Sequence, residues 1–160
     1  MAENEAHRNR VFLVVVDDTP EREVALKYAA LRAKKSGGRV ALLRVLEPVG
    51  QTEWAGIGAM LAEERRREAE QLLSGLAAQV TEITGGMPII LIREGEPREE
   101  LLQLLNEDPR MSILVLAAAP GPGGPGPLIS ALTGRHAHRL RVPLTIIPPG
   151  ITEEELERVT

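Results

Sequence analysis

The sequence contains no cysteine and only one residue each of phenylalanine, tyrosine and tryptophan. Without cysteine, the protein has no disulfide bond, no thiolate metal ligand and no cysteine nucleophile. So few aromatic side chains cannot form the platform on which the bases of single-stranded nucleic acids stack. The formal net charge of -4 at pH 7 agrees with this, because nucleic-acid-binding surfaces are usually basic. We therefore expect no nucleic-acid partner.

Long apolar runs are missing as well. No stretch approaches the roughly 20 residues of a membrane-spanning helix, so we expect no membrane partner. The opening residues, MAENEAHRNR, are too polar and acidic for a secretory signal, and we expect a cytoplasmic location. The chain has 43% hydrophobic and 26% charged residues over 160 positions, which is typical of one folded domain. We assign this domain to residues 11–149, between a flexible tail at 1–10 and an acidic extension at 150–160.

Five short apolar runs alternate with helical patterns along the chain. The first, from Val11 to Asp17, is rich in β-branched residues and apolar on both faces, as in a central strand of a parallel sheet. Strands are also expected at residues 39–48, 87–94, 112–119 and 142–149, and helices at 20–36, 59–86, 96–109, 128–140 and 151–160. Strands that alternate with helices predict an α/β fold with a doubly wound, five-stranded, Rossmann-like parallel sheet.

The segments that follow the first two strands carry signals of their own. Thr19 is the expected N-cap of the first helix, and Gly37 is its expected C-terminal stop. The loop between the second strand and the long second helix contains Trp54, Ile57 and Met60. These three side chains either form a lid over a ligand or are buried against the long helix, and the sequence does not separate the two.

The fold class predicts where a ligand binds. In open α/β sheets, ligands bind outside the carboxyl ends of the strands, at the point where the strand order reverses. The residues expected there are Asp17 and Asp18 after the first strand, Val45 to Pro48 after the second, and the loop PGPGGPGP from Pro120 to Pro127 after the fourth.

The chain resembles the universal stress protein family of UspA-like proteins. The resemblance is carried by the stretches VVVDDTPEREVALKYAALRAKKSGGRVALLRVLEP, REGEPREELLQLL and ILVLAAAPGPGG…LTGRHAHRLRVPLTIIP, and it spans about Val11 to Pro148. It implies an adenine nucleotide alpha hydrolase-like fold with strand order 3-2-1-4-5, and a homodimer. It also implies one of two functions. The first is a stress sensor that binds ATP, with magnesium, and the second is a dimeric interaction module that binds an unidentified protein partner and no nucleotide.

The glycine-rich loop resembles the phosphate motif of the ATP-binding members, G-x2-G-x9-G-[S/T]. Gly121, Gly124 and Gly134 match its spacing, but Arg135 stands where the family has Ser or Thr. Aligning the end of the fourth strand instead puts Ala117 at the first glycine, and the loop then becomes a short insertion. The glycines of the loop keep N–H groups that could bind a phosphate, but its four prolines have no N–H to donate. The loop is therefore either a phosphate cradle or a rigid turn. Arg135 is either a bidentate phosphate ligand or a solvated side chain.

Two further residues match positions at which the family contacts a nucleotide. Asp17 resembles the acidic residue that meets the nucleotide at the end of the first strand, and Val45 resembles the residue that borders the adenine. An Asp after a strand also commonly caps the next turn, and a Val in a strand is ordinary core. We favour the binding role for Asp17, because Thr19 is available to cap the helix.

The sequence shows no catalytic or metal site. It has no nucleophile-elbow motif, no Walker lysine and no evident base for an attacking water, so slow ATP hydrolysis is the most that it supports. His136 and His138 are two positions apart on the expected fourth helix and would not face the same way.

The fifth strand, Val142 to Ile147, is expected at an edge of the sheet. It carries no charge, and an unprotected edge tends to pair with another strand. We expect two copies to pair through it and to bury Leu144, Ile146 and Ile147. The alternative is that residues 151–160 fold back and cover the edge within one chain.

Overall fold

The structure is a computed structural model that describes residues 10–48 and 55–160. The flexible tail expected at residues 1–10 lies outside the described residues except for Arg10, and Trp54 lies outside them too. The elements, in chain order, are β1 (Val11–Val15), α2 (Arg22–Ser36), β2 (Arg39–Leu46), α3 (Ala55–Thr84), β3 (Ile89–Glu94), α4 (Pro97–Glu107), β4 (Met111–Ala117), α5 (Pro127–Thr133), the 3-10 turn η1 (Ala137–Arg139), β5 (Leu144–Ile147) and α6 (Glu153–Val159).

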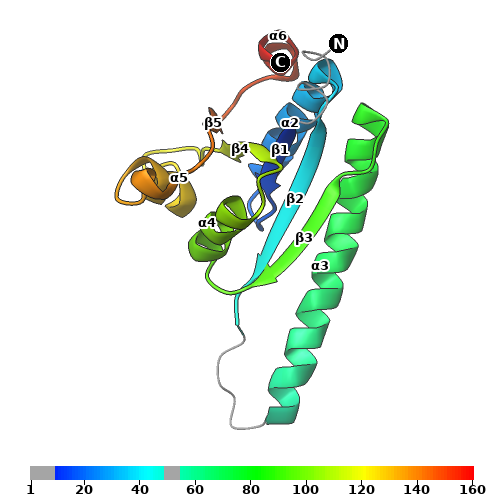
Figure 1. The fold of residues 1–160 in the computed structure, drawn as a ribbon, viewed down its shortest axis with the longest axis vertical. Helices are drawn as coiled ribbons and strands as arrows, with labels where there is room; N and C mark the ends of the chain where they lie inside the picture. Colours follow the sequence, from blue (N-terminus) through cyan, green and yellow to red (C-terminus); the bar gives the residue numbers. More distant parts are fainter. Residues whose placement is uncertain (1–9, 49–54) are drawn as a thin grey trace.

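The five strands form one parallel sheet in the order β3-β2-β1-β4-β5 (Figure 1). This confirms the expected doubly wound fold and strand order. β1 lies at the centre, with Val11 beside Arg39 of β2 and beside Met111 of β4. The strand order reverses between β1 and β4, so the crevice at their carboxyl ends is the expected ligand position.

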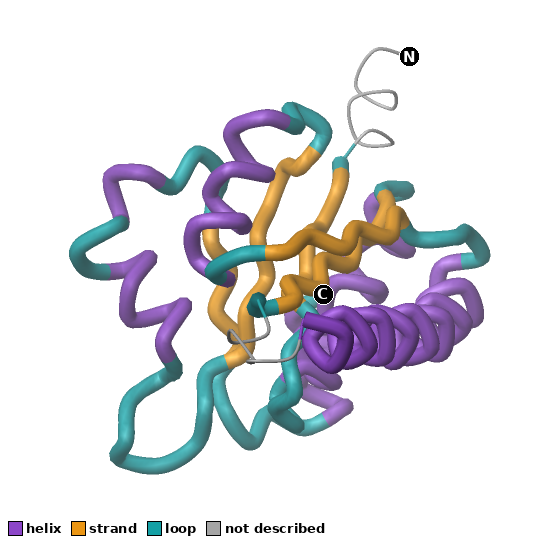
Figure 2. Tube along the Cα trace, turned by 90° about the horizontal axis from the view of Figure 1, so that it is seen from below, coloured by secondary structure: helices purple, strands orange, loops and turns teal. Residues whose placement is uncertain are grey.

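Helices cover both faces of the sheet (Figure 2). Phe12, Val14 and Val16 pack with buried residues of α2 and α3, whereas Leu13 and Val15 pack with buried residues of α4 and α5. Every residue of β1 is therefore buried, as its doubly apolar sequence predicts. The carboxyl end of this strand is held rigidly from two sides.

The start of α2 differs from the sequence-based expectation. The helix begins at Arg22, its N-cap residue is Glu21, and Glu21 makes no side-chain capping hydrogen bond. Thr19 is not the N-cap: within the described residues no helix N–H donates to its hydroxyl, and its hydroxyl and N–H both donate to Oδ1 of Asp17, at 2.6 and 2.9 Å. The expected end is confirmed: Gly37 has a φ of 71°, and its N–H donates to the carbonyl of Ala33.

Two other helices also differ from their expected bounds. α3 begins four residues early, so Ile57 belongs to the helix as Met60 does, with exposed fractions of 51% and 71%. Neither residue is buried and neither lines the cleft at the strand ends, and the first half of α3 extends past the sheet (Figure 1). The expected helix at 128–140 is interrupted after Thr133, because Gly134 leaves the helical region with a φ of -115° and a ψ of -116°.

The C-terminal helix α6 packs against α2. Leu156 is 2% exposed, the carboxylate of Glu153 pairs with Lys27, and Arg32 donates to the carbonyl of Thr160 at 3.1 Å. The segment therefore does not cover the edge strand β5, which was the alternative to a dimer. On β5 itself, Ile146 is 40% exposed, but Ile147 is already buried within the chain and would not add to a dimer contact.

Candidate functional site

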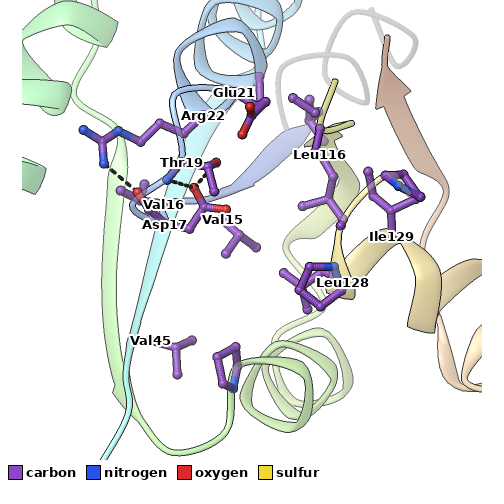
Figure 3. A pocket seen from close by; sticks show the side chains of 18 of the residues that line it. Val15, Val16, Asp17, Thr19, Glu21, Arg22, Val45, Leu116, Leu128 and Ile129 are labelled. Carbon is purple, nitrogen blue, oxygen red and sulfur yellow. Dashed lines mark hydrogen bonds between the residues drawn. The ribbon is translucent and has the colours of Figure 1, made fainter. Parts of the chain in front are cut away.

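A cleft of about 220 Å³ opens at the carboxyl ends of β1, β2 and β4. Its walls are mostly apolar, and its polar side chains come from the exit of β1 and the start of α2, with the exception of Arg44 from β2. Figure 3 shows Asp17, Thr19 and Arg22 on that side, with Leu116, Leu128 and Ile129 opposite them. The lining residues are Val15, Val16, Asp17, Thr19, Glu21, Arg22, Ala25, Arg44, Val45, Pro97, Val115, Leu116, Ala117, Ala119, Pro125, Gly126, Pro127, Leu128 and Ile129.

Asp17 stands at the exit of β1 and is half-buried. Its Oδ1 accepts both hydrogen bonds from Thr19 and so holds the turn into α2. Within residues 10–48 and 55–160, the structure shows no hydrogen bond to its other oxygen, Oδ2. One carboxylate thus has a turn-capping oxygen and an oxygen that can accept from a ligand. The two roles that the sequence left open for this residue are compatible.

Val45 and Pro97 form a second wall of the cleft. Val45 lies near the end of β2 and is half-buried, and Pro97 opens α4. α4 is brought close to β2 by Gly95, whose N–H donates to the carbonyl of Leu46 at 3.0 Å. Gly95 has a φ of 148°, which favours glycine, and Glu96 then caps α4 by accepting from the N–H of Glu99 at 2.8 Å.

Two arginines that were not predicted from the sequence, Arg22 and Arg44, also line the cleft. Nη1 of Arg22 donates to the carbonyl of Asp17 at 2.5 Å, and Nη1 of Arg44 donates to the carbonyl of Val16 at 3.0 Å. Nη2 of Arg44 also pairs with Asp18 at 3.0 Å. The arginines therefore fix the backbone at the exit of β1. The Nε atoms of both are buried, with no hydrogen-bond partner among the described residues.

Each arginine carries a signal that sequence reasoning could have used. Arg22 lies in the first turn of a helix, where a cation opposes the helix dipole. Arg44 interrupts the apolar run from Val40 to Leu46 within β2. A charge in either position is unfavourable unless a specific partner compensates for it, and here the partners are the carbonyls at the end of β1.

The glycine-rich loop holds its tip away from the cleft. The N–H of Ala119 donates to the carbonyl of Pro125 at 3.0 Å, which closes the loop at its base. Gly121 and Gly124, with φ of 90° and 91°, are exposed on the loop and do not line the cleft. Of this loop and its base, Ala119, Pro125, Gly126 and Pro127 reach the lining.

The remaining two predicted site residues lie after α5. Gly134 and Arg135 are both exposed, and neither lines the cleft. The structure therefore brings Asp17 and Val45 together at one cleft and does not bring the three motif glycines or Arg135 there.

An ion-pair cluster fixes α4 to the turn η1. Arg139 donates to both carboxylate oxygens of Glu99, at 2.8 and 2.7 Å. This contact lowers the pKa of Glu99 to about 2. The pKa of the neighbouring His136 is also lowered, first by desolvation and then by the charges of Arg98 and Arg139.

Two kinds of site are missing from the part of the chain that the structure describes. Within residues 10–48 and 55–160, no group of three or more His, Asp or Glu side chains is arranged to hold a metal ion. None of the helices described there is both long and apolar enough to cross a bilayer.

The same fold occurs in other solved structures. The universal stress protein UspA from Lactobacillus plantarum has a TM-score of 0.72 at 16% identity, over 88% of this chain and 98% of that one. A family member from Arabidopsis thaliana with AMP bound has a TM-score of 0.61 at 15% identity, over 91% and 94%. A universal stress protein in complex with cAMP has a TM-score of 0.54 at 18% identity, over 86% and 95%. At identities this low, the structural similarity shows a shared fold alone.

Comparison at the sequence level decides the family. No curated protein sequence matches the chain significantly. Residues 8–148, most of the 160, match a family model described as the universal stress protein family. This match confirms the resemblance found in the sequence and agrees with the strand order of the sheet. The chain belongs to the universal stress protein family.

Proposed function

We propose that this chain is a cytoplasmic, dimeric universal stress protein whose cleft binds an adenine nucleotide. The observation that carries the proposal is the cleft itself, which lies at the reversal of the strand order and is lined by both Asp17 and Val45. Structures of the same fold with AMP or cAMP bound support it. ATP, with magnesium, is the ligand that the sequence resemblance implies.

The lining suits a nucleoside. Val45 and Pro97 offer an apolar wall for a flat base, and the opposite wall, with Leu116 and Ile129, excludes water from it. Oδ2 of Asp17 is placed to accept a hydrogen bond from a ribose hydroxyl or from a base amine. Binding of this kind leaves the turn-capping bonds of Oδ1 intact.

The test is calorimetric titration of AMP into the intact chain and into Asp17→Asn. Asparagine keeps an oxygen that can accept from Thr19 and replaces the charged Oδ2 with an uncharged amide nitrogen. We expect a loss of roughly 1–3 kcal/mol, or about 5- to 150-fold in affinity, as for a hydrogen bond to a charged group. Glu154→Gln, an exposed change of the same charge on α6, is the matched control and should bind normally. Equal affinity in Asp17→Asn, with the fold intact, would remove Asp17 from the site.

The homodimer is the second part of the proposal. β5 is an edge strand that α6 leaves uncovered, and Ile146 is exposed on it. Pairing of two β5 strands across a two-fold axis would satisfy the open backbone groups of both copies.

A dimeric interaction module that binds no nucleotide is the second candidate. The observation that favours it is the glycine-rich loop, whose prolines lack N–H groups and whose tip lies away from the cleft. Absence of binding by adenosine, AMP, ATP and cAMP, together with a dimeric mass in solution, would favour this candidate.

A further inference from the structure

We infer that the cleft is selective for adenosine and AMP over ATP. This inference rests on the proposed function and specifies its ligand. Two properties of the chain support it: the backbone donors after β4 and the charges around the cleft.

Few backbone donors face the cleft in segment 118–127. The N–H of Ala118 donates to Ile147 and that of Ala119 donates to Pro125, so both are already used. Four of the remaining positions are prolines, and three of the glycines are exposed outside the lining. Gly126 is the one residue of this segment that both lines the cleft and keeps an N–H without a partner in the structure.

A triphosphate needs more than this. An anion-binding nest is built from several successive N–H groups, and alternating prolines interrupt such a succession. Beyond the segment, Leu128 and Ile129 in the first turn of α5 (Pro127–Thr133) also line the cleft, but Pro127 separates their N–H groups from that of Gly126, and the seven-residue helix has a correspondingly small dipole. The backbone after β4 therefore cannot surround three phosphates in the arrangement that the structure shows.

The charges around the cleft also disfavour a long phosphate chain. The lining contains two carboxylates, Asp17 and Glu21, and two guanidinium groups, Arg22 and Arg44. Arg44 is paired with Asp18, and Arg22 lies 4.0 Å from Glu23. Lining residues and ion-pair partners together make four carboxylates against two cations, a local sum of -2.

The arginines cannot readily turn to a ligand. Nη1 of each is bound to a backbone carbonyl at the exit of β1, and Nε of each is buried away from solvent. Freeing either guanidinium would leave a carbonyl without its partner, which opposes the change. Within residues 10–48 and 55–160, Nη2 of Arg22 is the one terminal guanidinium nitrogen of the two arginines with no hydrogen bond, so each phosphate beyond the first adds charge to surroundings whose local sum is already -2.

The experiment is calorimetric titration of adenosine, AMP and ATP into the intact chain, with and without Mg²⁺. We expect adenosine and AMP to bind at least 10-fold more tightly than ATP under both conditions. Equal or tighter binding of ATP would overturn the inference and leave the proposed function standing. Failure of all three compounds to bind would overturn both.

A pair of variants tests the donor argument. Pro125→Ala with Pro127→Ala adds two N–H groups at the cleft, and we expect the preference for AMP over ATP to shrink several-fold. Pro120→Ala with Pro122→Ala adds two N–H groups on the exposed part of the loop and is the matched control, with no change expected. An unchanged preference in the first pair, or an equal change in both pairs, would contradict the assignment of selectivity to these donors.

Discussion

The docking of α6 on α2 depends on one buried side chain, Leu156. We predict that Leu156→Ala lowers the free energy of unfolding by about 2–3 kcal/mol. The substitution removes three carbon atoms from a side chain that is 2% exposed, and about 0.8 kcal/mol for each gives about 2.4 kcal/mol. The site lies at the end of the chain, where α6 can shift and partly close the space, so only a small cavity term is added.

The polar contacts of α6 cannot replace this side chain. Glu153 pairs with Lys27 and Glu157 lies 3.8 Å from Lys35, but both glutamates are largely exposed and both lysines are partly exposed. Exposed ion pairs of this kind contribute about 0–1 kcal/mol each. We therefore expect α6 to detach from α2 in the variant before the rest of the domain unfolds.

Urea denaturation measures the free energy, and hydrogen exchange of the α6 amides measures the detachment. Glu154→Ala changes an exposed residue of the same helix and is the control, with an expected effect within about 0.5 kcal/mol. Affinity for AMP should be unchanged in both variants, because α6 does not line the cleft. A loss below about 1 kcal/mol in Leu156→Ala, with α6 still protected, would refute the docking argument.

Three further predictions concern other parts of the molecule. The lowered pKa of Glu99 means that its ion pair with Arg139 stabilises the fold above about pH 4.5, and this contribution is lost as the pH falls towards 2. Arg139→Leu should return the pKa of Glu99, measured by NMR, to its ordinary range. A pKa that stays near 2 in this variant would contradict the prediction. Gly95→Ala should lower the free energy of unfolding by about 1–3 kcal/mol in a denaturation experiment, because a φ of 148° is strained for alanine. An unchanged denaturation midpoint would contradict this and show that the turn can rearrange. Ile146→Lys should convert a dimer to a monomer in light scattering at low micromolar concentration, and a monomeric mass for the parent chain would exclude the dimer.

The fold could be predicted from the sequence because its main signals are local and repeated. The run from Val11 is apolar on both faces only because β1 is central, and the alternation of strand and helix patterns then fixes the fold class. Boundaries were less predictable where two local signals compete. The hydroxyl of Thr19 donates to Asp17 in a turn that precedes the helix, and α2 begins later than a cap at Thr19 would place it.

The candidate site was only partly predictable. Asp17 and Val45 were found because strand ends in an α/β sheet converge at the reversal of strand order. The glycine spacing of the loop says nothing about whether its base is closed, since the bond from Ala119 to Pro125 depends on the conformation of every residue between them. Arg22 and Arg44 stand at positions that are unfavourable for a cation, which is a signal in the sequence, but the backbone carbonyls that compensate for them are shown only by the structure.

Mapping of AMP binding by NMR tests the central claim most directly. Titration of AMP into the isotope-labelled chain should shift the amide signals at the carboxyl ends of β1 and β2 and at the start of α5, with Asp17, Val45 and Gly126 among the largest changes. The amides of Gly121 and Gly124 should move little. Shifts confined to another surface, such as the contact of α2 with α6, or no shifts at millimolar AMP, would contradict the account.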